Sequence, residues 1–230
     1  MKDDFENWNR NSSERFIFDM LVRRADTAVV DYWDQILEII AANVDPDNKD
    51  YELRLDMLSL IEHLLQQPNL HSTIIFYTEI IIKLILLPST EWRAGIPNVS
   101  IRKGAVICLM KLLEQKLIEK EKLQPMFKEI INKFKSLLDD EWANEIRFAA
   151  LIFIKNLISY RQDDKPHEDY VDVYPQLLMR LDDAQDGIRI ECCKALEVFF
   201  EKLPNPWSSS LYEYTIKAIM IHLDDPNPEV

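Results

Sequence analysis

The stretch Leu181–Arg189, which reads LDDAQDGIR, recurs at a fixed distance along the chain. One period earlier, the segment 138–147 begins with the same Leu-Asp-Asp triplet and ends with the same Ile-Arg pair. One period later, Leu223–Val230 reads LDDPNPEV. The arginines at 147 and 189 lie 42 residues apart, and so do the leucines at 181 and 223. The phrase therefore marks an internal repeat, and no strand-like segment lies between its copies.

A strand-free repeat of roughly 40–47 residues is typical of the two-helix HEAT and armadillo units. Between the phrases, apolar residues recur at steps of three and four, which is the period of one helix face. The sequence therefore predicts an all-α fold, a right-handed α-solenoid of about five antiparallel helix pairs. The predicted helices cover residues 13–24, 27–43, 50–66, 71–87, 97–117, 122–138, 142–160, 168–181, 186–203 and 207–223.

We expect one continuous repeat domain over residues 1–230. In such arrays each repeat covers the apolar face of its neighbour, and the terminal repeats carry polar caps. The predicted helix that ends near Leu223 has no partner helix before Val230. The array is therefore expected to be incomplete at its C-terminus, and its completeness at the N-terminus is left open.

The composition disfavours several classes of protein. A net charge of −13 repels phosphate backbones and anionic lipids, so we expect neither nucleic acid nor membrane as a partner. The 3 glycines are too few and too scattered for a phosphate-binding loop. The 3 cysteines lie in apolar helical patterns, which predicts buried thiols in a reduced, cytoplasmic protein. The polar start is not a signal peptide, and the apolar stretch Ile74–Leu87 is expected to be too short to span a bilayer.

Side chains with metal-binding or catalytic chemistry are scattered. The four histidines, at positions 63, 71, 167 and 222, show no zinc-ligand spacing. No serine, cysteine or lysine lies in a nucleophile motif. We therefore predict no cofactor, no metal site and no catalytic activity. The alternative is an enzyme whose site has no recognisable motif, which would require a pocket with converging titratable groups.

The charged residues of the repeated phrase are interpreted as structural, because catalytic sites are seldom copied in every repeat. The aspartate pairs can cap the second helix of each repeat, where a carboxylate meets the positive helix end. The arginines are spaced to form a ladder with carboxylates of the same or the next repeat. The residues predicted for these roles are Arg102, Asp139, Asp140, Arg147, Asp182, Asp183, Arg189, Asp224 and Asp225.

The loop Pro88–Asn98 is the best candidate for a partner-binding site. It is longer than the turns of the other repeats, and it carries Trp92 and Arg93, residue types that are enriched at interface hot spots. The alternative is that Trp92 folds back and fills the gap between its own helices. The sequence does not decide between these two interpretations.

Three stretches resemble the C-terminal half of the dynein axonemal assembly factor 5 family of HEAT-repeat proteins. They are the segment 87–109, which contains the Trp-Arg-Ala-Gly loop, the segment 174–183 and the segment 222–226. The Trp-Arg-Ala-Gly loop is the most specific of them, because the HEAT consensus does not predict it. The resemblance is strongest over residues 85–110 and 170–228, and the rest of the chain follows by repeat pattern.

The resemblance implies a cytoplasmic, non-catalytic scaffold that helps to preassemble axonemal dynein arms for motile cilia. Its expected partners are proteins, namely axonemal dynein chains and chaperones. The alternative is a HEAT-repeat adaptor of another system, of the nuclear transport receptor or phosphatase scaffold type. The sequence leaves the oligomeric state open.

Overall fold

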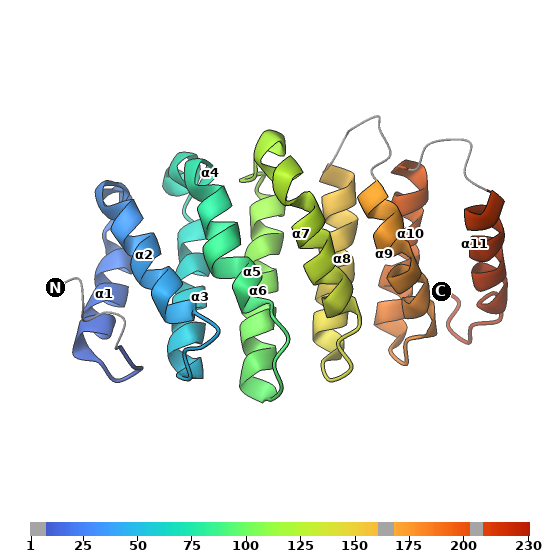
Figure 1. Ribbon diagram of the computed structural model, residues 1–230, viewed down its shortest axis with the longest axis horizontal. Coiled ribbons are helices and arrows are strands. Elements are labelled where there is room, and N and C mark those ends of the chain that lie inside the picture. The colour runs from blue at the N-terminus through green and yellow to red at the C-terminus, as the bar shows by residue number, and fades with distance from the viewer. Residues whose placement is uncertain (1–7, 161–167, 203–208) are drawn as a thin grey trace. The chain divides into compact units, whose positions relative to one another are not determined.

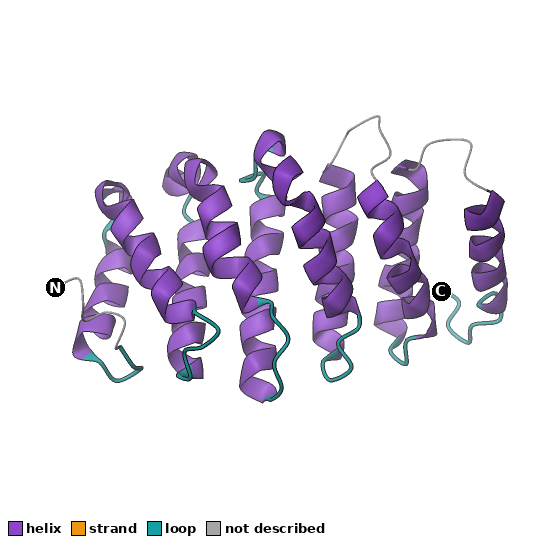
Figure 2. Cartoon of the chain, in the orientation of Figure 1, coloured by secondary structure: helices purple, strands orange, loops and turns teal. Residues whose placement is uncertain are grey.

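The computed structural model describes residues 8–160, 168–202 and 209–230, and all regular elements within these ranges are helices (Figure 2). The predicted all-α class is confirmed. The chain forms two compact units, Met1–Gln124 and Pro125–Val230. The continuous solenoid of HEAT repeats and the single domain remain predictions.

The first unit consists of helices joined by short turns (Figure 1). Its elements are α1 (Ser13–Arg24), the 3-10 helix η2 (Asp26–Tyr32), α2 (Trp33–Val44), α3 (Tyr51–Leu65), the 3-10 helix η3 (Pro68–Leu70), α4 (His71–Ile80), the π-helix η4 (Ile81–Leu86), α5 (Leu87–Ser89), α6 (Ile96–Glu114) and the start of α7 (Lys120–Leu138).

The helices of the first unit form two rows. α3 contacts α1 on one side and α6 on the other, while α2 packs on α3, and η4 packs on both α2 and α6 (Figure 1). The spacing of apolar residues along α3 explains this arrangement. These side chains are inaccessible to solvent because they pack against the neighbouring helices. These side chains are Leu53, Met57, Leu58, Leu60, Ile61, Leu64 and Leu65.

The helical segment Pro68–Ser89 is longer than the sequence indicated. It has 22 residues with a mean hydropathy of 1.7, so by length and composition it could cross a membrane. The expectation that its apolar stretch is too short is therefore wrong, because helical structure continues on both sides of Ile74–Leu87. Its side chains Ile74, Ile82 and Ile85 are nevertheless fully buried within the unit. The segment packs on α2 and α6 as a core helix does.

The second unit contains the rest of α7, then α8 (Asn144–Tyr160), α9 (Glu168–Met179), the 3-10 helix η5 (Arg180–Asp182), α10 (Asp186–Lys202) and α11 (Ser209–Ile221). α8 and α9 both pack on α10. Aromatic rings fill this core: Phe134 stacks on Phe153 with centroids 3.8 Å apart, and Tyr174 stacks on Phe199 at 5.4 Å.

The predicted helices agree with the observed ones to within a few residues. The main differences are internal: predicted helix 27–43 divides at Trp33 into a 3-10 and an α-helix, and predicted helix 71–87 contains the π-helix η4. The outermost positions of two predictions, residue 203 and residues 207–208, lie outside the described residues.

Candidate functional site

Two arginines of the second unit each bind an aspartate that lies 36 residues further along the chain. Arg147 Nε donates to Asp183 Oδ2 at 2.7 Å, and Arg147 Nη2 donates to Asp183 Oδ1 at 3.1 Å. Arg189 binds Asp225 in the same way, at 2.8 and 3.0 Å. Such two-point pairs fix both position and orientation.

The same arginines also bind the main chain of their own turns. Arg147 Nη1 donates to the carbonyl of Asp140 at 2.7 Å, and Arg189 Nη1 donates to the carbonyl of Asp183 at 2.9 Å. Each arginine thus joins the turn before its own helix to the turn of the following repeat. Of the predicted residues, the structure brings Arg147, Asp183, Arg189 and Asp225 together in a ladder of this form.

The ladder carboxylates lie in a strongly cationic environment. Burial by itself would raise the pKa of Asp183, but hydrogen bonds from Arg147 and from the backbone of Gln185 outweigh it, so the pKa lies below its ordinary value. For Asp225, the hydrogen bond from Arg189 is the largest cause of a lowered pKa. Both side chains therefore stay ionised in mildly acidic solution.

The second aspartate of each phrase closes a turn instead of capping the following helix. Asp183 Oδ1 accepts from the backbone N–H of Gln185 at 3.1 Å. Asp140 Oδ1 accepts from Trp142 and Ala143, at 3.1 and 3.0 Å, and Asp225 Oδ1 accepts from Asn227 at 2.8 Å. These N–H groups precede α8 and α10 or follow α11, so the expected helix caps are replaced by turns within the loops.

The first aspartate of each phrase lies nearer the surface. Asp139 is 3.6 Å from Arg180, and Asp182 is 3.6 Å from His222. Asp224 is exposed. The two aspartates of a phrase thus have different roles: Asp183 and Asp225, the second of their pairs, bind an arginine of the preceding repeat, whereas Asp139 and Asp182, the first of theirs, make only long contacts of 3.6 Å.

In the first unit, Arg54 of α3 and Arg102 of α6 also lie in the N-terminal part of their helices and bind main-chain carbonyls that precede these helices. Arg54 Nε donates to the carbonyl of Val44 at 3.2 Å, and Arg102 Nη1 donates to the carbonyl of Arg93 at 2.9 Å. Both arginines are almost inaccessible to solvent. Burial, and after it the charge of Arg93, lowers the pKa of Arg54. Such buried guanidinium groups must be met by carbonyl or carboxylate oxygens.

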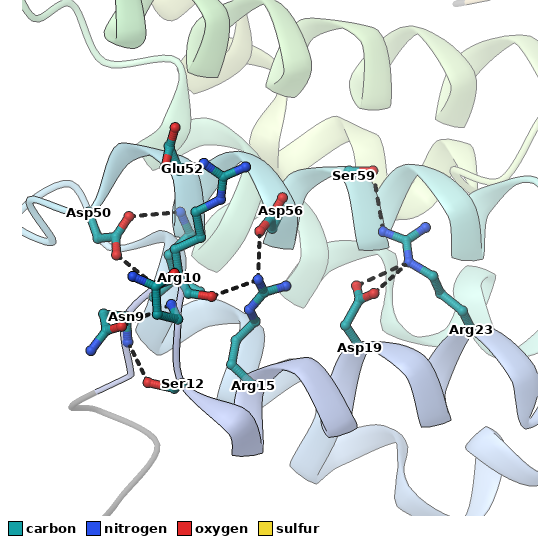
Figure 3. A network of polar contacts seen from close by, with 12 residues as sticks. Asn9, Arg10, Ser12, Arg15, Asp19, Arg23, Asp50, Glu52, Asp56 and Ser59 are labelled. Atoms are coloured by element: carbon teal, nitrogen blue, oxygen red, sulfur yellow. Dashed lines mark hydrogen bonds and ion pairs between the residues drawn. The ribbon is translucent and has the colours of Figure 1, made fainter.

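Arg15 is a further ladder residue that sequence reasoning missed (Figure 3). Its Nη2 donates to the carbonyl of Arg10 at 2.8 Å and lies 3.2 Å from the carboxylate of Asp56 on α3. No Leu-Asp-Asp phrase precedes α1, so the repeated pattern gave no signal here. The available signal was positional, because Arg15 and Arg54 both stand near the start of their helices.

The predicted loop Pro88–Asn98 is shorter in the structure, because its ends belong to α5 and α6 and only residues 90–95 lie between these helices. This loop is held by polar contacts. Arg93 Nη2 lies 3.2 Å from Asp47 and 3.7 Å from Glu91, and the carbonyl of Arg93 accepts the bond from Arg102. At the end of the loop, Gly95 adopts φ 102°, a left-handed conformation that other residues adopt only with strain. The loop is therefore fixed by its backbone and by Arg93.

The indole of Trp92 does not fill the core, because 50% of its surface is exposed. Ile96, which follows Gly95, is 83% exposed. Ile96 also borders an open depression whose lining includes the apolar residues Tyr51, Leu55 and Pro97. The polar part of the lining consists of Lys49, Asp50, Glu52 and Ser100.

Ile96 and Trp142 are among the exposed apolar residues that sequence reasoning missed. Trp142 lies in the turn before α8 and is 79% exposed. Both residues lie beside turns, where the helical period does not require an apolar side chain. An apolar residue at such a position was the sequence signal that could have identified them. Trp142 provides a second exposed tryptophan with which Trp92 can be compared.

Two of the three cysteine thiols are buried, as expected, and the third is only partly buried. Burial raises the pKa of Cys108 to about 12 and also raises that of Cys192, as expected for buried thiols. Cys193 is only partly buried, and its Sγ lies 3.4 Å from the carbonyl of Val230. Within the described ranges, no three His, Cys, Asp or Glu side chains gather closely enough to hold a metal ion.

Comparison with known proteins gives one consistent result, although no family model matches the chain. Dynein axonemal assembly factor 5 of Mus musculus is 24% identical over 231 residues, which cover 97% of this chain, and that of Homo sapiens is 23% identical over 227 residues, or 95%. The predicted resemblance is confirmed, and the alignment extends well beyond residues 85–110 and 170–228. The chain spans about a quarter of the length of these relatives, 27% and 26%.

Proposed function

We propose that this chain is a non-catalytic scaffold that helps to assemble axonemal dynein arms in the cytoplasm before they enter motile cilia. The observation that carries the proposal is the similarity to dynein axonemal assembly factor 5 over 97% of the chain. Large multidomain chains expose apolar surface while they fold and assemble. A helical protein with outward-facing apolar side chains on a fixed loop is suited to hold such intermediates.

The surface that we assign to partner binding consists of Trp92, Ile96 and the depression beside Ile96. Large side chains that are exposed before binding and buried afterwards contribute most of the affinity at interfaces. A loop that is already fixed loses little conformational entropy when a partner binds. Arg93 supports this surface, because its contacts with Asp47 and Glu91 hold the loop.

The test is affinity purification of the tagged protein from the cytoplasm of cells that are building cilia, followed by mass spectrometry. Enrichment of axonemal dynein chains and chaperones supports the proposal. Enrichment of nuclear transport cargo or of phosphatase subunits instead contradicts it and favours an adaptor of another system.

The variants Trp92→Ala and Trp142→Ala form a matched pair, because both remove an exposed indole from a turn. Trp92→Ala is expected to reduce dynein capture at least fivefold, whereas Trp142→Ala is expected to leave it unchanged. Both variants are expected to unfold within about 0.5 kcal/mol of the wild type, because neither side chain is part of the core. A large loss of stability with Trp92→Ala would show that the indole is a core residue after all.

A further inference from the structure

Helix α4 and the π-helix η4 carry a stripe of exposed apolar side chains. Phe76 is 72% exposed, Ile80 is 41% exposed and Leu84 is 57% exposed. They stand at steps of four residues, the spacing that places side chains on one face of a helix. Leu84 lies in the π-helix itself, a rare conformation that is frequent at functional sites. Apolar side chains that adjoin one another on a surface mark an interaction site more strongly than scattered ones do.

The contacts within the first unit leave this stripe uncovered. The other side of the same segment is buried, and η4 packs there on α2 and on α6. The buried side chains are Ile74, Ile81, Ile82 and Ile85. The helices next to the segment are therefore already in place. In a repeat array each unit contacts only the units beside it, so a repeat added at either end of the chain would not lie over this inner helix.

Phe76 is held in position before any partner binds. Its ring meets the ring of Tyr77 edge to face, with centroids 5.0 Å apart. The ammonium group of Lys122, at the start of α7, lies 5.7 Å from the centre of the Phe76 ring. Lys122 is itself fixed, because its Nζ donates to the carbonyl of Ile75 at 2.7 Å. A large ring that is exposed and yet fixed loses little conformational entropy on binding, as the anchor residues of interfaces do.

The border of the stripe toward α2 is acidic. The Tyr77 hydroxyl is hydrogen-bonded to Asp34, which places this exposed carboxylate of α2 beside the aromatic pair. Glu38, also exposed, lies one turn further along the same face of α2. The charges on the stripe's own helix cancel, because Lys83 binds Glu79 at 2.6 Å. An apolar stripe with a negative border is complementary to an apolar surface with a positive border.

We propose that the stripe formed by Phe76, Ile80 and Leu84 binds an amphipathic helix of a partner protein, one with basic side chains along the edge that faces α2. Such a helix buries its apolar face on the stripe, as helices do in the apolar grooves of other proteins. A membrane is a poorer occupant, because the acidic border and the net charge of −13 repel anionic lipids. The stripe differs from the surface around Trp92, and the proposal does not depend on the proposed function.

The probe is a synthetic peptide of about five helical turns, with leucine at steps of three and four, lysine elsewhere and one photoreactive phenylalanine derivative on its apolar face. It is irradiated with the 230-residue protein, and mass spectrometry maps the adducts. We expect adducts on the segment Pro68–Ser89 that saturate at micromolar peptide. The double variant Phe76→Ala, Leu84→Ala is expected to lower their yield about tenfold.

The matched control is the double variant Phe16→Ala, Leu21→Ala on α1, whose side chains are 62% and 58% exposed. It is expected to leave the yield on Pro68–Ser89 unchanged. A second peptide, with glutamate in place of every lysine, tests the acidic border and is expected to give about a tenth of the yield there. Circular dichroism establishes that each variant is folded.

Three results would overturn the proposal. The first is the absence of adducts on Pro68–Ser89 up to about 1 mM peptide, an affinity too weak for a specific site. The second is a yield there that Phe76→Ala, Leu84→Ala does not lower, or that is equal for the lysine and glutamate peptides. The third is flotation of the wild-type protein, but not of this double variant, with vesicles of phosphatidylcholine and phosphatidylserine, because a membrane would then be the occupant.

Discussion

The two units use arginines at the same place in the repeat but provide different acceptors. In the second unit the residue 36 positions after Arg147 is Asp183, which receives a two-point ion pair. In the first unit the residue 36 positions after Arg54 is Thr90, whose hydroxyl donates to the carbonyl of Leu87 at 2.7 Å. Arg54 instead donates to the main chain at Val44.

This difference shows how the repeat can exchange a structural turn for an exposed loop. In the phrases that begin at Leu181 and Leu223, the second aspartate closes the turn and binds the arginine 36 positions earlier. Where the loop of residues 90–95 replaces the phrase, Arg93 supplies a carbonyl to Arg102, and Trp92 is left half exposed. Substitutions in the ladder measure how far it stabilises the second unit, and substitutions in the loop of the first unit show whether that loop has a different role.

The largest effect is expected for Asp183→Ala. The change leaves the guanidinium of Arg147, 13% exposed, without its carboxylate, and removal of one partner from a buried ion pair costs about 3 kcal/mol or more. Urea unfolding at pH 7 measures the loss. Asp182→Ala is the matched control, and we expect it to stay within about 0.5 kcal/mol, because Asp182 is 79% exposed. Equal losses in the two variants would contradict the ladder.

A second test uses pH. The pKa values of Asp183 and Asp225 are lowered in the folded protein, so the stability that they provide is present above their unfolded pKa of about 3.9. It is lost as the pH falls through the lowered folded values. The free energy of unfolding, measured from pH 6 to pH 2, is therefore expected to decrease below about pH 4. Asp225→Asn should make this decrease shallower, and an unchanged slope would be inconsistent with the assigned role.

An intermediate effect is expected for Arg15→Ala, which tests the ladder residue at the start of the first unit. The variant loses a hydrogen bond to the carbonyl of Arg10 and an ion pair with the partly exposed Asp56, together worth about 1–2 kcal/mol. Thermal unfolding measures the change. Arg24→Ala, in the same helix but exposed, is expected to have little effect. If both variants were equally stable, Arg15 would not belong to the ladder.

The smallest effect is expected for Arg93→Ala. Its ion pair with Asp47 is exposed, and such pairs contribute less than about 1 kcal/mol. The main-chain carbonyl that binds Arg102 is retained in the variant. Gly95→Ala is expected to cost more, about 1–2 kcal/mol, because alanine is strained at φ 102°. Comparison of the two melting temperatures would show whether the side chain or the glycine fixes the loop.

The sequence predicted most of the helices and the ladder residues of the second unit, because an undisturbed repeat copies residue type and geometry together. The sequence contained no indication of Arg15, because its acceptors, the carbonyl of Arg10 and the carboxylate of Asp56, do not belong to a Leu-Asp-Asp phrase. It also assigned the aspartates to helix ends, because the distance from a carboxylate to a turn N–H cannot be read from residue order. The exposure of Trp92 was equally out of reach, since an aromatic residue in a loop can point either way.

The most direct test of the account is site-specific photocrosslinking in cells that are building cilia. A photoreactive phenylalanine derivative replaces Trp92 in one variant and Trp142 in another, so that two exposed turn positions are compared. The account predicts adducts with axonemal dynein chains at position 92 and none at position 142. Adducts of equal yield at both positions, or adducts with other proteins alone at position 92, would contradict the claim that this loop binds dynein arms during assembly.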